Sequence, residues 1–126
     1  STGRCDMQTD LLSLILYTSK TDEMVEFYRT HFGYSVHREP DDRIVELRPP
    51  GAGATLLLHP AAKGQRTGQS AVKLVFACDD VESFCKTSRQ RGLSFGALHK
   101  GHGYVFANAK DPSGNSVSIS GRITAV

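Results

Sequence analysis

The chain of 126 residues carries the same succession of predicted elements twice, and this internal repeat constrains its fold more than any other feature. In the first half, the apolar and β-branched run 11–18 precedes a helical pattern that ends at Gly33. In the second half, the strand-like run 71–77 precedes a helical pattern that ends at Gly92, about 60 positions later. Equal spacing of matching elements indicates a duplicated unit.

Each half is predicted to form a strand, a helix and three further strands. Apolar residues at helical spacing mark the helices, because positions three and four apart share one helix face. These positions are Met24, Phe27, Tyr28, His31 and Phe32 in the first half and Val81, Phe84, Cys85 and Ser88 in the second. Polar residues at 19–22 are expected to cap the first helix, and Asp79 with Glu82 resembles a capping box for the second. The strands are expected at 11–18, 34–37, 43–48 and 54–59, and at 71–77, 93–98, 104–109 and 116–120.

These elements divide the chain into a tail, two modules and a linker. Residues 1–10 are expected to be a loose tail, 11–60 the first βαβββ module and 71–122 the second. The segment 61–70 is polar and rich in Gly, Gln and Ala, which is typical of a linker. A chain of this length buries roughly two-thirds of its unfolded surface, which is enough for one α+β domain.

Composition argues against large charged or lipid partners. Lys and Arg number 15 and Asp and Glu 13, so the formal charge is +2, and this weak field does not favour nucleic acid. The longest apolar run, at 11–17, is far shorter than the roughly 20 residues that span a bilayer. No signal peptide is visible, and Cys5, Cys78 and Cys85 cannot all pair with one another. We therefore expect a cytoplasmic protein with no membrane partner.

Two motifs resemble the vicinal oxygen chelate superfamily, which includes glyoxalase I, bleomycin resistance proteins and extradiol dioxygenases. The first is Phe27-Tyr28 followed by Phe32-Gly33, after an apolar strand. The second is Asp-Pro-Ser-Gly-Asn at 111–115, directly before the last strand. The resemblance covers residues 11 to about 122 and implies two tandem βαβββ modules. Their strands would form a cupped, barrel-like mixed β-sheet with the helices outside.

Metal-dependent members of the superfamily take one ligand from the first and last strand of each module. The corresponding positions here hold Ser13, Leu57, Lys73 and Ser118. Divalent transition metals prefer imidazole, thiolate or carboxylate, so this set predicts no metal and no other cofactor. A register slip of two residues would add His59, but one histidine cannot hold a metal alone.

No catalytic residue is predicted. His31 and His37 have no carboxylate partner at a suitable spacing, and no histidine forms a Ser-His-Asp or Cys-His set. Cys78 and Cys85 fall on apolar faces, where burial makes a thiol inert.

Strand alternation places a second set of side chains on the side of each sheet away from the helix. This side would form a cup for a small organic ligand, with Lys73 as the charge anchor. The predicted ligand-binding residues are Ser13, Tyr17, Leu57, His59, Lys73, Tyr104 and Ser118. In the alternative interpretation Lys73 pairs with Glu46, the serines satisfy one another, and the cup is a closed core or a dimer surface.

The sequence therefore predicts a bleomycin-resistance-like protein that binds a small, anionic or aromatic molecule without a metal. Two alternatives remain open: a metal-dependent lyase, transferase or dioxygenase with atypical ligands, and a protein-interaction or regulatory subunit. The resemblance also implies a homodimer, because relatives commonly assemble by pairing or exchanging modules.

Overall fold

The computed structural model describes residues 10–122, so most of the predicted tail lies outside the described residues. The first module consists of β1 (Ser13–Thr18), α1 (Thr21–Phe32), β2 (Ser35–Arg38), β3 (Val45–Arg48) and β4 (Thr55–Pro60). The second consists of β5 (Lys73–Ala77), α2 (Val81–Gln90), β6 (His99–Lys100), β7 (Val105–Lys110) and β8 (Ser116–Ser120). Both modules therefore follow the predicted order of one strand, one helix and three strands.

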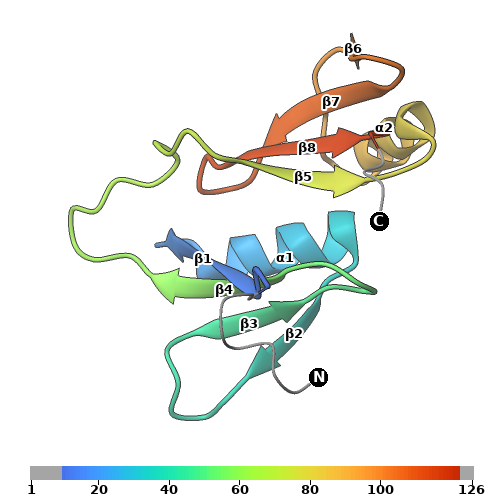
Figure 1. Cartoon of the computed structure of the whole chain (residues 1–126). Coiled ribbons are helices and arrows are strands. Elements are labelled where there is room, and N and C mark those ends of the chain that lie inside the picture. The colour runs from blue at the N-terminus through green and yellow to red at the C-terminus, as the bar shows by residue number, and fades with distance from the viewer. Residues whose placement is uncertain (1–9, 123–126) are drawn as a thin grey trace.

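Each module forms its own four-stranded mixed sheet. The strand orders are β1-β4-β3-β2 and β5-β8-β7-β6, so the two sheets have the same topology. In both, the first and last strands of the module pair in parallel, and the other pairs are antiparallel. The sheets lie one above the other and are cupped without closing into a barrel (Figure 1).

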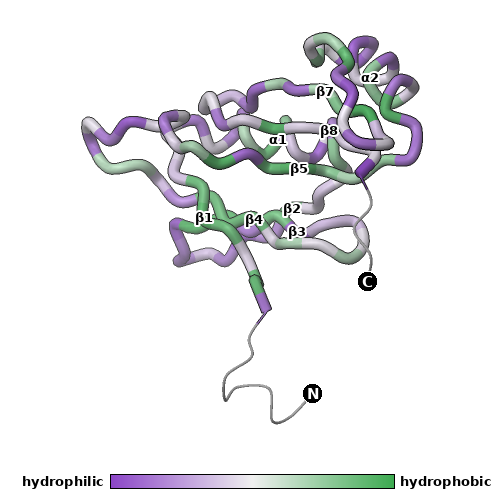
Figure 2. The backbone as a smooth tube through the Cα atoms, turned by 45° about the horizontal axis from the view of Figure 1, so that its top comes forward, coloured by the Kyte–Doolittle hydropathy of each residue, from purple (hydrophilic) through white to green (hydrophobic). Residues whose placement is uncertain are grey.

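Side chains alternate across these strands as predicted. Along β5, Leu74 and Phe76 are partly buried and pack against the hydrophobic core, whereas Lys73, Val75 and Ala77 are exposed. The first strand repeats this pattern, and both strands are mostly hydrophobic (Figure 2). We call the side of each sheet away from its helix the open face.

The modules pack through α1 and the helix-facing side of the second sheet. The ring of Phe32 stacks on Phe76 with centroids 3.9 Å apart and an interplanar angle of 19°. One core cluster contains Met24 and Tyr28 from α1 together with Val117 from β8, all fully buried. A hydrophobic contact of this extent fixes the two modules as one body.

A buried carboxylate reinforces this junction. Asp111 is 4% exposed and accepts a hydrogen bond from Tyr28 Oη at 2.7 Å. It also accepts from the backbone N–H of Ser113 at 2.9 Å, and from the backbone and side-chain amides of Asn115 at 2.9 and 2.8 Å. Burial, and then the carboxylate, raise the pKa of Tyr28 far above its usual range. The Thr18 and Ser113 hydroxyls form a second buried link between the modules.

Both predicted helix starts are wrong, and both predicted glycine ends are confirmed. In α2, Gly92 follows the C-cap Arg91 with φ of +95°. Gly33 ends α1 with φ of +73°, a left-handed conformation that glycine adopts without a Cβ penalty. Helix α1 begins after Lys20 with no side-chain cap, although polar residues at 19–22 were expected to supply one. In α2 the cap is Asp80, whose carboxylate accepts from Ser83 N, one residue later than the predicted Asp79.

The strand predicted at 93–98 is also wrong. That segment is irregular, and the strand β6 occupies only His99–Lys100. Leu93 and Phe95 point into the core from an extended loop, which produces the same period of two as a strand. Gly96 N donates one hydrogen bond to Asn108 O, but no regular ladder follows.

Within residues 10–122, none of the helices has the length and apolar character needed to cross a bilayer.

Candidate functional site

The seven predicted ligand-binding residues fall into two groups, one on each open face. On the first sheet Tyr17 lies beside His59, with ring centroids 5.1 Å apart. Leu57 pairs with Ile15, and Ser13 lies at the start of β1 opposite Thr55. These residues follow the predicted alternation, and the exposed Tyr17 also borders a cleft of about 290 Å³ beside the linker.

The second group surrounds a hollow of about 480 Å³ on the open face of the second sheet. Its lining contains the predicted Lys73, Tyr104 and Ser118, together with Val75, Ala77, Phe106, Ser120 and Arg122. None of the first-sheet candidates lines this hollow. The structure therefore brings together three of the seven predicted residues. We call the cavity and its eight lining residues the second-sheet hollow.

Lys73 is an exposed charge in the second-sheet hollow. Its Nζ donates to Asn108 Oδ1 at 3.0 Å and lies 5.8 Å from the centroid of the Phe106 ring. The alternative pair with Glu46 is not formed, because the Glu46 carboxylate accepts from Arg48 Nε at 2.7 Å. The ammonium of Lys73 is therefore held by a neutral amide and an aromatic face, and both leave its charge available to an anion.

The serines of the hollow bond to the backbone rather than to one another. Ser118 is 2% exposed, and its hydroxyl donates to Ala107 O at 3.0 Å. Ser120 Oγ accepts from Arg122 N at 3.1 Å. Since the Ser118 proton is engaged, its hydroxyl faces the hollow mainly as an acceptor.

Sequence reasoning missed Phe106 and Arg122. The Phe106 ring lies 6.1 Å from Tyr104, and the guanidinium of Arg122 lies 5.8 Å from the Tyr104 centroid. Strand alternation carried the signal for Phe106, because it lies two positions after Tyr104 on the same strand run. The Tyr104 ring also lies directly over Gly101, where an added Cβ would meet ring atoms at 2.3 to 2.7 Å.

The two modules differ in charge. Residues 71–122 carry seven Lys and Arg against four Asp and Glu, whereas residues 11–60 carry five against seven. All four ion pairs between described residues lie in the first module, at positions 22–48. Among the residues that line the second-sheet hollow none is acidic. The hollow is therefore a site of positive potential with aromatic walls.

Comparison with known proteins identifies the superfamily to which this fold belongs. The sequence profile described as Glyoxalase/Bleomycin resistance protein/Dioxygenase superfamily matches residues 10–119. The chain belongs to this superfamily. Both motifs that carried the resemblance lie within the matched residues.

Individual relatives of this superfamily member are distant. Uncharacterized protein YetH from Bacillus subtilis (strain 168) is 22% identical over 108 residues, covering 82% of this chain and 90% of that protein. The structure of TnmS3, an antibiotic binding protein from Streptomyces sp. CB03234, is 21% identical with a TM-score of 0.73, covering 90% of this chain and 96% of that one. Lactoylglutathione lyase from Agrobacterium tumefaciens is 22% identical with a TM-score of 0.68, covering 90% and 94%. Structural similarity at these sequence identities establishes the fold.

The residues at the superfamily's metal positions do not suit a divalent transition metal. Ser13 and Ser118 offer neutral hydroxyls, Leu57 offers no donor, and Lys73 offers a cation. Throughout 10–122, no three His, Cys, Asp or Glu side chains lie close enough together to hold a metal ion.

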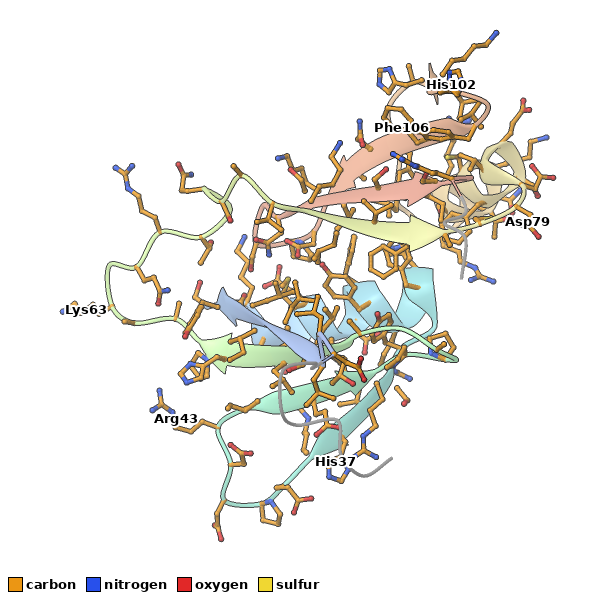
Figure 3. All side chains as sticks on the ribbon, viewed as in Figure 1. His37, Arg43, Lys63, Asp79, His102 and Phe106 are labelled. Carbon is orange, nitrogen blue, oxygen red and sulfur yellow. The ribbon has the colours of Figure 1, made fainter. Side chains whose placement is uncertain are left out.

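The histidine and cysteine side chains considered as reactive groups do not line the second-sheet hollow. His37 does have a carboxylate partner, contrary to expectation, since its Nε2 lies 2.6 Å from Glu39 Oε2 on the exposed strand β2. His37 is labelled in Figure 3 in the first module, far from Phe106 in the second. Burial raises the pKa of the Cys85 thiol, which weakens it as a nucleophile. Cys5 lies outside the described residues.

Proposed function

We propose that this protein binds a small acidic, aromatic organic molecule in the second-sheet hollow, without a metal and without changing it covalently. The observation that carries the proposal is the position of Lys73, whose ammonium lies over Phe106 and faces no carboxylate. The volume of about 480 Å³ falls within the range of small-molecule sites. An anionic group would bind the ammonium while an aromatic ring packs against Phe106 and Tyr104.

The name of TnmS3 describes an antibiotic binding protein of the same fold, which supports non-catalytic binding as the role of this site. A metal-dependent lyase, transferase or dioxygenase is the first alternative. Metal analysis after dialysis separates the two, because a stoichiometric divalent metal in active protein contradicts the proposal. A regulatory subunit is the second alternative, and it predicts no binding of small acidic molecules.

The direct test is calorimetric titration with biphenyl-4-carboxylate, using Lys73→Met. Methionine keeps an unbranched apolar stem and removes the charge. We expect binding to weaken by roughly 1.5–3 kcal/mol, the value of a hydrogen bond to a charged group. Lys86→Met is the matched control, because Lys86 is an exposed lysine on α2 outside the hollow. Equal affinity of the Lys73 variant and the parent protein contradicts the assigned site.

We further propose that the protein is a homodimer in which a second copy packs on the open face of the first sheet and leaves the second-sheet hollow accessible. Ile15 and Tyr17 on that face are exposed by 48% and 43%. The opposite net charges of the modules suit the first module of one copy to the second module of another. Light scattering coupled to gel filtration tests this, and a monomer at high concentration contradicts it.

A cytoplasmic location completes the proposal. It is supported by the free thiols of Cys78 and Cys85, which suit a reducing compartment. Fractionation of cells that produce the protein is the corresponding test.

A further inference from the structure

The second-sheet hollow holds two cations over one aromatic surface. The rings of Tyr104 and Phe106 have centroids 6.1 Å apart and an interplanar angle of 36°. His99 extends this surface, with its ring 5.2 Å from Phe106 at 32°. The three rings form a continuous platform on which a planar ligand can lie.

The first cationic group lies at Phe106, the middle ring of the platform. Lys73 Nζ lies 5.8 Å from the Phe106 centroid. Lys110 shares its row, because Ser116 pairs with Lys73 on one side and with Lys110 on the other. Lys110 Nζ donates to Ser116 Oγ at 2.9 Å, so both ammonium groups are bonded only to neutral oxygens in the described structure.

The second cationic group lies at Tyr104, a terminal ring of the platform. Arg122 lies two residues beyond the end of β8, and its guanidinium lies 5.8 Å from the Tyr104 centroid. No ion pair between described residues involves this guanidinium. A guanidinium presents paired N–H donors that match a carboxylate, so Arg122 is suited to a second acid.

The two cationic side chains arise from opposite ends of the second sheet. Lys73 and Ala77 lie at opposite ends of β5, about 13 Å apart along the strand. Ala77 pairs with Ser120, two residues before Arg122, so Arg122 is at the far end from Lys73.

We infer that the preferred ligand class is a rigid aromatic diacid, with one acidic group at Lys73 and Lys110 and the other at Arg122. This inference rests on the proposed function, since it specifies the ligand of the same hollow. No acidic side chain lines the hollow, so a diacid meets two complementary charges and no repulsion there. A diamine or a zwitterion would place a positive charge beside one of the two groups.

The test compares diacids with monoacids of the same ring system by calorimetric titration. The probes are biphenyl-4,4′-dicarboxylate against biphenyl-4-carboxylate, and benzene-1,4-dicarboxylate against benzoate. We expect at least a tenfold advantage for the diacid in one pair. Arg122→Met should remove this advantage and leave monoacid affinity within about twofold, because the monoacid uses Lys73 alone. Lys100→Met removes the same charge outside the lining and should preserve the advantage.

Three outcomes overturn the inference. If monoacid and diacid bind equally in both pairs, the diacid class is wrong while the proposed function stands. If Arg122→Met weakens both probes by the same factor, Arg122 does not act as a separate group. If no acid binds the parent protein, the proposed function fails and the inference fails with it. Thermal unfolding of each variant separates lost binding from lost folding.

Discussion

The two modules share one topology but use their charges in opposite ways. In the first module charged side chains pair with each other: Glu46 with Arg48 at 2.7 Å, and Glu39 with His37 at 2.6 Å. On the open face of the second module Lys73 and Arg122 lie over aromatic rings without a carboxylate. The duplicated scaffold therefore needs the alternation of apolar residues, whereas the charges on its open faces were free to diverge. A neutralised face and an unmatched one can serve different roles within one fold.

The largest effect on stability is expected at Asp111, which links the two modules through Tyr28. Asp111→Ala removes the acceptor of Tyr28 Oη and of two backbone N–H groups in a buried site. We expect the free energy of unfolding to fall by about 3 kcal/mol in urea denaturation, because buried donors are left unpaired. Asp79→Ala, at an exposed position, should stay within about 0.5 kcal/mol of the parent. Similar losses for both variants would show that Asp111 does not hold the junction.

An acidic side chain introduced on the open face of the second sheet should remove the contrast between the two faces. Val75 is 61% exposed between Lys73 and Ala77 on β5. Val75→Glu supplies an internal partner for Lys73 and repels an acidic ligand, so affinity for biphenyl-4-carboxylate should fall about tenfold, or roughly 1.4 kcal/mol. Val72→Glu makes the same change at an exposed position outside the hollow and should leave calorimetric affinity unchanged. Equal losses in both variants would point to a general charge effect.

A smaller effect is expected on the neutralised face. Glu46→Gln breaks the exposed pair with Arg48. Such pairs contribute about 0.2–1 kcal/mol, so the free energy of unfolding should fall by no more than that and the difference should shrink in high salt. Affinity for the acidic probe should not change, because Glu46 does not line the second-sheet hollow. A large gain in affinity would mean that the two faces act on one ligand.

The smallest effect is expected on the pH dependence of the melting temperature, through His31 on α1. Burial, helped by Arg91, lowers the pKa of His31, whose Nδ1 is buried without a hydrogen-bond partner in the described structure. The unfolded chain then binds the proton more readily. The stabilising contribution is therefore present above about pH 6.5 and is lost as the pH falls through the lower pKa of the folded state. His31→Phe should reduce the drop in melting temperature between about pH 7.5 and 5.5, whereas His37→Gln, on exposed β2, should not.

Much of the fold was accessible from the sequence because it follows from short-range patterns. The alternation along β5 and the glycine at the end of α1 are properties of consecutive residues, and both are confirmed. The segment 93–98 misled because a loop that buries Leu93 and Phe95 has the period of a strand. A strand differs from such a loop by its hydrogen bonds to an adjacent strand, and the local sequence pattern does not predict these bonds.

The candidate site was less accessible because it depends on how strands from different parts of the chain lie side by side. Alternation correctly put Lys73 and Tyr17 on open faces, but it could not show that they belong to different sheets with separate surroundings. Arg122 lies beyond the last strand, where no periodicity applies. The role proposed for it rests on its contact with Tyr104 and its place in the lining of the hollow.

The close approach of Tyr104 to Gly101 has an evolutionary consequence. Because a methyl group at position 101 would occupy the space of the ring, a single change to alanine must tilt Tyr104 and reshape the wall of the hollow. That change alters no residue that meets a ligand through its own side chain. Ligand preference in descendants of this chain can therefore drift through a hairpin position that a survey of binding residues would pass over.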